Sequence, residues 1–241
     1  MIGIIGFGRF GKLTARYLAE EFDVAVYHRS DKSAAINCTG ARAASLESVC
    51  RQEIVIPCVP ISVFRDVLQD ITPLLRPDAL VVDVCSVKEY PVGLMVDILP
   101  QTVSILATHP MFGPDSASDS LSGRKICLCK IRIAENSYQN IKAYLAAKGL
   151  VVIEATAEEH DEQIATSLSL THFIGRTLSE YGARELDIDT EGYKRLLHIL
   201  GVVEHDTRQL FSDMHRYNPY AKEMRAAFMN AMAEIESELN S

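Results

Sequence analysis

A glycine-rich turn near the start of the chain has the spacing that holds nucleotide phosphates. The run Gly6-Phe7-Gly8-Arg9-Phe10-Gly11 directly follows the apolar residues Ile2–Ile5 and opens a helical pattern. Such glycines allow a tight turn, let the backbone approach a pyrophosphate and let the helix pack on the sheet. The helix start then offers unpaired N–H groups to the anion. The motif predicts dinucleotide binding; a purely structural glycine turn is the alternative.

The residues that follow the second apolar run bear on which dinucleotide is bound. NAD enzymes usually carry Asp or Glu here for the ribose 2′-hydroxyl, whereas this chain has His28, Arg29 and Ser30. A carboxylate would repel a 2′-phosphate, while a guanidinium and a hydroxyl would bind one. The pattern therefore favours NADP over NAD. The alternative is that Arg29 is a solvated loop residue and Asp31 binds the ribose.

Two further polar side chains come at the ends of later apolar runs. Ser86 lies in Asp83-Val84-Cys85-Ser86-Val87-Lys88, and His109 lies in a segment that continues with Pro110 and a glycine-bearing loop. Ligands of open α/β sheets bind at the carboxyl ends of strands. A histidine at such an end suits acid–base chemistry, although position alone fits a structural histidine equally well.

Seven short apolar runs must position these groups, and helix-length patterns such as 12–21 and 62–75 separate the early ones. Near-continuous apolarity is typical of strands buried on both faces of a parallel sheet. Strand and helix in alternation predict an α/β fold with a Rossmann-type, doubly wound sheet. The runs are Ile2–Ile5, Val24–Tyr27, Ile54–Val59, Leu80–Cys85, Val103–Ala107, Lys125–Cys129 and Leu150–Glu154.

The pattern changes after Thr156, and the rest of the chain is predicted to be all-helical. Helical spacing runs to Gly182, from about Gly192 to His215, and again over Ala221–Leu239 after an Asn-Pro turn. We therefore divide the chain into a dinucleotide-binding domain, 1–155, and a helical substrate and dimerisation domain, 156–241. The second is too small and too amphipathic to stand alone, so we expect it to contact the first domain and a second copy.

Composition restricts the class of protein. The chain has 241 residues, 48% of them apolar, and a net charge of −8 with no dense run of Lys or Arg. This argues against nucleic acid and anionic membranes as partners. Six cysteines without C-x-x-C spacing predict a reduced, cytoplasmic protein, and no apolar run approaches the ~20 residues of a membrane span. Glu159-His160-Asp161 lacks a further ligand at suitable spacing, so no metal site is expected.

Taken together and in order, the motifs resemble the prephenate/arogenate dehydrogenase family of tyrosine biosynthesis. The resemblance covers nearly the whole chain, and the segment from Arg29 to Asp31 with Ser86–Glu89 is most similar to the NADP-using arogenate branch. It implies a homodimer, with His109 as catalytic base, Ser86 supporting it and His172 near the substrate. It rests on Gly6–Gly11, Asp83–Lys88, His109–Asp115, Glu159–Asp161, Thr171–Phe173 and Tyr217–Ala221.

The reaction that this resemblance implies is the oxidative decarboxylation of a cyclohexadienol, prephenate or arogenate. His109 takes the proton of the ring hydroxyl as hydride passes to the nicotinamide, and carbon dioxide leaves as the ring becomes aromatic. Ser86 contacts the same hydroxyl or orients His109. Cys58, Pro60 and Asp83 complete the predicted cofactor-binding residues.

The substrate-binding residues are less clearly marked. Many family members carry a basic residue on the second tail helix, before the Asn-Pro turn. Arg208 and Arg216 are the candidates here, although a surface arginine is at least as good an interpretation of each. Asp206 would attract the ammonium of arogenate and disfavour the keto acid of prephenate, unless it is solvated on the outer face of its helix.

Two other functions stay open. One is another two-domain dehydrogenase of small hydroxy acids or imines. Such enzymes usually rely on a lysine in the helical domain, and this chain has none between Thr156 and Leu186. The other is a non-catalytic NADP sensor, which would need the glycine turn but neither Ser86 nor His109.

Overall fold

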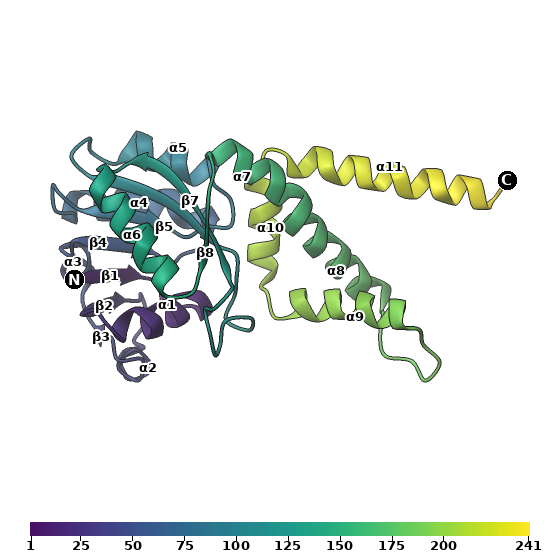
Figure 1. The fold of residues 1–241 in the computed structure, drawn as a ribbon, viewed down its shortest axis with the longest axis horizontal. Coiled ribbons are helices and arrows are strands. Elements are labelled where there is room, and N and C mark those ends of the chain that lie inside the picture. Colours follow the sequence, from purple (N-terminus) through teal and green to yellow (C-terminus); the bar gives the residue numbers. More distant parts are fainter. The chain divides into compact units, whose positions relative to one another are not determined.

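The structure, a computed structural model, describes all 241 residues (Figure 1). Contacts between residues divide the chain into two compact units, Met1–Glu158 and Glu159–Ser241. The sequence pattern had placed this division after residue 155.

The first unit is built on one eight-stranded sheet, in the order β3-β2-β1-β4-β5-β6-β7-β8. Its first six strands have the Rossmann order, and the order reverses between β1 and β4, where such sheets bind ligands. The strands are β1 (Ile2–Ile5), β2 (Val24–Tyr27), β3 (Arg42–Ala43), β4 (Ile54–Pro57), β5 (Leu80–Asp83), β6 (Ser104–Pro110), β7 (Lys125–Arg132) and β8 (Val151–Glu154).

Helices pack on both faces of this sheet, which makes it doubly wound as predicted. Ile2 and Ile4 of β1 join one buried cluster with Ala15 of α1. Gly3 faces the other way, where an added Cβ would lie 2.3 Å from the carbonyl oxygen of Val49 in α3. The helices are α1 (Arg9–Ala19), α2 (Ser33–Asn37), α3 (Leu46–Cys50), α4 (Phe64–Ile71), α5 (Glu89–Ile98) and α6 (Glu135–Ala147).

The sheet differs from the predicted one in two places. β3 has only two residues, one of them Arg42, so no apolar run marks it. β7 pairs antiparallel with β6, with His109 opposite Cys127. Every other strand pair of the sheet is parallel. An apolar run indicates that a strand is buried but not the direction in which it runs, so nothing in the sequence indicated this one antiparallel pair.

The second unit is helical, and glycines mark two of its features. Gly182, with φ of +82°, ends α8 in the left-handed conformation, as the sequence break predicted. Gly175 lets α9 approach α8, since an added Cβ would lie 2.6 Å from Val203 Cγ2. The helices are α7 (Ala157–Ile164), which spans the division, α8 (Leu170–Tyr181), α9 (Glu191–Glu204), α10 (Arg208–Tyr217) and α11 (Ala221–Leu239), with a π-helical turn over Ala165–Ser169.

The predicted single helix from Gly192 to His215 is instead two helices. Thr207 caps α10, because its side chain accepts a hydrogen bond of 3.1 Å from the Leu210 amide. A threonine in this role starts a new helix rather than continuing the old one. Asp206 therefore lies in a bend between α9 and α10.

None of the helices combines the length and the apolarity needed to cross a membrane.

Candidate active site

The glycine turn has the geometry of a phosphate cradle. An added Cβ on Gly6, whose φ is +101°, would lie 2.3 Å from the carbonyl oxygen of Cys58, and one on Gly11 would lie 2.2 Å from that of Gly6. Gly8 differs, because nothing lies within 4 Å of its added Cβ. The turn is thus packed at both ends and open in the middle.

The helix that follows is prepared to meet an anion. α1 begins at Arg9 without a side-chain cap and without an acidic residue in its first turn. Its N-terminal amides and positive dipole end are therefore available to a phosphate. Arg9 forms an ion pair of 2.5 Å with Asp115, and Phe10 lies 6.5 Å from the ring of Phe112. Phe7 is buried in the core beneath the turn, and Pro60 is exposed just after β4.

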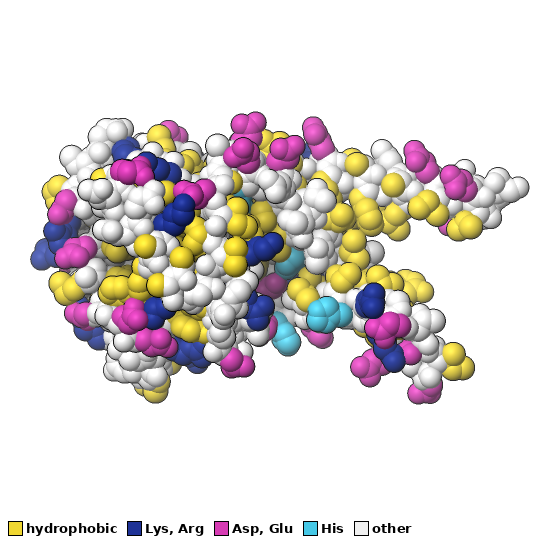
Figure 2. Space-filling model, in the orientation of Figure 1, with side chains coloured by type: hydrophobic (Ala, Val, Ile, Leu, Met, Phe, Trp, Pro, Cys, Tyr) yellow, Lys and Arg dark blue, Asp and Glu magenta, His cyan; other side chains and the backbone are white.

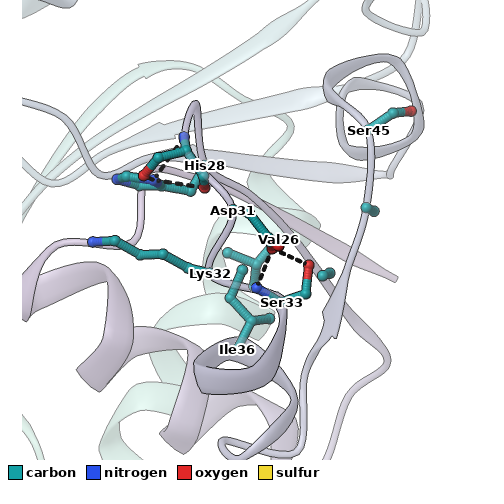
Figure 3. A pocket seen from close by; sticks show the side chains of 10 residues that line it. Val26, His28, Asp31, Lys32, Ser33, Ile36 and Ser45 are labelled. Atoms are coloured by element: carbon teal, nitrogen blue, oxygen red, sulfur yellow. Dashed lines mark hydrogen bonds between the residues drawn. The ribbon is translucent and has the colours of Figure 1, made fainter.

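A cavity of about 310 Å³ lies beside the end of β2, at the place where the ribose of a dinucleotide is expected (Figure 3). His28 and Ser30 line it and contact each other, with 3.0 Å between His28 Nδ1 and Ser30 Oγ. Arg29 is exposed and is not among the lining residues. The full lining is Val26, His28, Ser30, Asp31, Lys32, Ser33, Ile36, Ala43, Ala44 and Ser45.

Two charged residues of this cavity, Asp31 and Lys32, have contacts that the sequence did not predict. The Asp31 carboxylate accepts hydrogen bonds from the Ser33 amide at 2.9 Å and the Ser33 hydroxyl at 2.7 Å, which lower the pKa of Asp31. It is thus engaged at the start of α2. Lys32, which the sequence reading missed, donates to the carbonyl oxygen of Phe7 at 3.1 Å. It brings a cation to the wall between this cavity and the glycine turn.

Ser86 and His109 come from the ends of neighbouring strands. β5 and β6 pair in parallel, with Asp83 beside Ala107, so both side chains lie at the same edge of the sheet. The Ser86 hydroxyl is buried and has no hydrogen-bond partner, and His109 is only 6% exposed. The structure therefore places the two residues expected to do the chemistry at the ends of neighbouring strands.

A fully buried ion pair joins the two segments that carry them. Lys88 pairs with Asp83, and its ammonium also donates to the carbonyl oxygen of Thr108 at 2.6 Å. Asp83 in turn accepts from the Cys85 amide at 2.6 Å, and Thr108 Oγ1 donates to the Asp83 carbonyl oxygen at 2.7 Å. These bonds hold the residue before His109 to the turn before Ser86. The sequence reading assigned Asp83 to the cofactor and gave Lys88 no part in this network.

In the helical unit, His172 and Asp206 lie together. His172 is 3% exposed, and its Nε2 lies 3.7 Å from Asp206 Oδ2. Burial lowers the pKa of His172 and nearby Arg176 adds to this, while the Asp206 carboxylate opposes it. The two arginines expected near the substrate are both exposed on the surface of this unit. Arg208 is exposed and forms an ion pair of 2.6 Å with Glu180, and exposed Arg216 lies 5.7 Å from the centre of the Tyr217 ring.

Two other arginines take part in this cluster, and the sequence reading missed both. Arg176 donates through Nη2 to the carbonyl oxygen of Asp206, and its place four residues after His172 was the available signal. Arg225 contacts His215, with 2.8 Å between Arg225 Nη1 and His215 Nδ1. Burial, Arg225 and His172 lower the pKa of His215 to about 4. No three His, Cys, Asp or Glu side chains are grouped so that they could hold a metal ion.

Comparison with known proteins gives these features a family. The sequence model "Prephenate dehydrogenase, nucleotide-binding domain" matches residues 20–154, and "TYRAAT1-like, C-terminal domain" matches residues 177–241. Arogenate dehydrogenase 2, chloroplastic, of Arabidopsis thaliana is 35% identical over 248 residues, which cover 99% of this chain and 69% of that protein. The chain belongs to the prephenate/arogenate dehydrogenase family.

This family membership confirms the resemblance carried by the motifs. Arabidopsis arogenate dehydrogenase 1, chloroplastic, is 33% identical over 251 residues, covering 99% of this chain and 39% of that longer protein. The named members are dehydrogenases, so the chain belongs to a family of oxidoreductases that use a nicotinamide cofactor.

Solved structures of the family share the fold. Prephenate dehydrogenase from A. aeolicus, in complex with hydroxyphenyl propionate and NAD+, matches with a TM-score of 0.79 at 19% identity, covering 99% of this chain and 90% of that one. Synechocystis arogenate dehydrogenase matches with a TM-score of 0.72, also at 19% identity, covering 99% and 91%. These likenesses confirm the predicted Rossmann-type domain with a helical C-terminal region.

Proposed function

We propose that this chain is an arogenate/prephenate dehydrogenase that prefers NADP and catalyses the oxidative decarboxylation of a cyclohexadienol. The observation that carries the proposal is that Ser86 and His109 are buried at neighbouring strand ends in a member of this family. A sensor would have no use for a buried serine and histidine at this edge. The glycine turn and the uncapped start of α1 fit the pyrophosphate of the cofactor.

The residues of the chain supply alignment and a base. His109 takes the proton of the ring hydroxyl, and Ser86, whose hydroxyl is buried and unpartnered, hydrogen-bonds the same oxygen or orients His109. The nicotinamide, when bound, supplies the hydride acceptor. Charge builds on the ring oxygen, carbon dioxide leaves, and the gain from aromatisation drives the reaction. The protein therefore needs to hold the reacting groups in line.

Replacing His109 tests this function. Wild-type protein should turn over arogenate or prephenate with NADP, and His109→Ala should lower kcat by about 10²–10⁴, the range for one general base. The Kd for NADP should stay within about threefold of wild type. His198→Ala, on the exposed face of α9, is the matched control and should leave kcat unchanged. A wild-type enzyme inactive on both substrates refutes the function, and a His109→Ala variant of normal kcat removes the base.

The position of Asp206 supports a preference for arogenate. Its carboxylate, 3.7 Å from His172 Nε2, is placed to attract the ammonium that arogenate has and prephenate lacks. Asp206→Asn should then lower the ratio of kcat/KM for arogenate over prephenate at least several-fold. The two ratios come from initial-rate measurements on the same preparations. An unchanged ratio means that Asp206 does not select the substrate.

The remaining assignments concern organisation and place. We assign cofactor binding to the first unit, and substrate binding and homodimerisation to the helical unit, whose α11 carries exposed apolar residues. The cytoplasm is the proposed compartment, supported by six cysteines that are all free. The two Arabidopsis relatives are named chloroplastic, so microscopy of a fluorescent fusion in the source cell is the deciding measurement.

A further inference from the structure

Several buried polar atoms of the helical unit have no hydrogen-bond partner. They are Ser169 Oγ, His172 Nδ1, Arg176 Nε and His215 Nε2. Nearly all buried polar atoms in folded proteins are paired, so a group of exceptions calls for an explanation. Three of the four residues, at positions 169, 172 and 176, lie on one side of the continuous helical segment that ends in α8. The fourth, His215, lies with its ring 6.1 Å from the ring of Phe173 in that segment.

The two nitrogens that matter most are hydrogen-bond donors. Arg176 Nε always carries a hydrogen. His215 Nδ1 faces the guanidinium of Arg225, which can only donate, so Nδ1 accepts and the hydrogen of the neutral ring is on Nε2. The ring stays neutral at physiological pH because burial, Arg225 and His172 lower its pKa to about 4. Arg176 and His215 thus leave two buried N–H groups without acceptors.

A carboxylate stands beside these donors. Arg176 Nη2 donates to the carbonyl oxygen of Asp206, and the Asp206 carboxylate lies 3.7 Å from His172 Nε2 with its side chain 29% exposed. One small region therefore offers N–H groups to an anion and a carboxylate to a cation. A ligand that matches both carries an ammonium and a carboxylate close together, which is the head group of an α-amino acid.

We propose that Arg176 and His215 bind the α-carboxylate of an amino-acid ligand whose α-ammonium is bound by Asp206. This inference rests on the proposed function, because arogenate ends its side chain in an α-amino acid. Arg225 is a positioning residue that fixes the tautomer of His215. The rings of Phe211 and Phe173, 4.6 and 6.1 Å from that of His215, hold the imidazole in place.

The test is a binding experiment that needs no turnover. Calorimetric titration of the full chain uses three probes that share a phenol ring: L-tyrosine, 3-(4-hydroxyphenyl)propionate without the ammonium, and tyramine without the carboxylate. Wild type should bind L-tyrosine at least tenfold more tightly than either of the others. His215→Phe keeps an aromatic ring between Phe211 and Phe173 but removes the N–H. It should weaken L-tyrosine and hydroxyphenylpropionate at least fivefold and leave tyramine unchanged.

A second variant and a control complete the design. Arg176→Gln should give the same pattern as His215→Phe, with thermal melts recorded to verify folding. Arg195→Gln removes an exposed arginine of α9 that pairs with Glu191, and should leave all three affinities unchanged. Normal L-tyrosine binding by both His215→Phe and Arg176→Gln overturns the proposal, as does a wild type that binds tyramine as tightly as L-tyrosine.

Turnover measured in parallel separates this proposal from the proposed function. A wild type that binds the probes in the expected order but turns over neither arogenate nor prephenate keeps the amino-acid site and loses the dehydrogenase function. An active wild type whose two variants bind L-tyrosine normally keeps the function and loses the site.

Discussion

Lys32 and Asp31 stand side by side in the sequence but behave oppositely at the cofactor cavity. The Asp31 carboxylate accepts hydrogen bonds from the Ser33 amide and hydroxyl, and these bonds stabilise the start of α2. Lys32 reaches toward the glycine turn and puts a positive charge on the cavity wall (Figure 3). An engaged carboxylate and an available ammonium both favour a 2′-phosphate over a 2′-hydroxyl.

Two cations could contact a 2′-phosphate: Arg29, which is exposed just after β2, and Lys32, which lines the cavity. Arg29→Ala should weaken NADP by about 1.5–3 kcal/mol, the scale of a hydrogen bond to a charged group, with NAD nearly unchanged. Lys32→Met should act in the same direction. Fluorescence titration of each variant with NADP and NAD gives the four Kd values. Equal losses for the two cofactors would contradict a 2′-phosphate contact, and a loss only in Lys32→Met would assign that contact to Lys32.

Residues that act through local spacing could be predicted from the sequence, and residues that act through distant partners could not. The glycine turn is recognisable from six consecutive residues, and Ser86 and His109 lie at the ends of recognisable apolar runs. By contrast, Lys88 donates a hydrogen bond to the Thr108 carbonyl oxygen, twenty residues away in the sequence, and Arg176 donates to that of Asp206, thirty residues away. A charged residue in the sequence looks solvated until the fold shows it buried.

At the scale of strands and helices, most elements could be predicted from the sequence, but one strand, one strand direction and one helix break could not. Seven of the eight strands coincide with apolar runs in the sequence, whereas β3 is too short and too polar to be predicted from such a run. The direction of β7 and the bend at Asp206 also escaped the sequence reading. The direction of β7 depends on the loop before it, because that loop lets the chain return beside β6 without a crossover helix. The bend at Asp206 depends on a single hydroxyl, because the Thr207 side chain caps a new helix.

The Lys88–Asp83 pair is the element-scale feature whose removal has the clearest consequence. Both side chains are fully buried, so Lys88→Met would leave the Asp83 carboxylate without its cation. Breaking one side of such a pair costs about 3–5 kcal/mol. Lys88→Met should therefore lower the free energy of unfolding by that amount in urea denaturation. The double variant Asp83→Asn/Lys88→Met, which leaves no buried charge, should recover a large part of it. A single variant as stable as wild type would show that the pair does not hold the ends of β5 and β6.

At the scale of the whole molecule, the helical unit leaves apolar surface uncovered. Met229, Met232, Ile235 and Leu239 of α11 are 50%, 49%, 59% and 79% exposed. Their spacing places them on one side of the helix, where Figure 2 shows hydrophobic side chains gathered along α11. Contiguous apolar surface of this kind marks an interaction site in soluble proteins.

A second copy of the chain is the partner that we expect on this surface. Light scattering at micromolar concentration should give twice the chain mass of 26.7 kDa. Met232→Glu/Ile235→Glu places two charges in the apolar stripe, where burial would strip them of water, and should give the mass of one chain. Glu234→Lys, on the opposite side of α11, changes charge without touching the stripe and should stay dimeric. Dimerisation through α11 is wrong if wild type is a monomer, or if the double variant keeps the dimer mass.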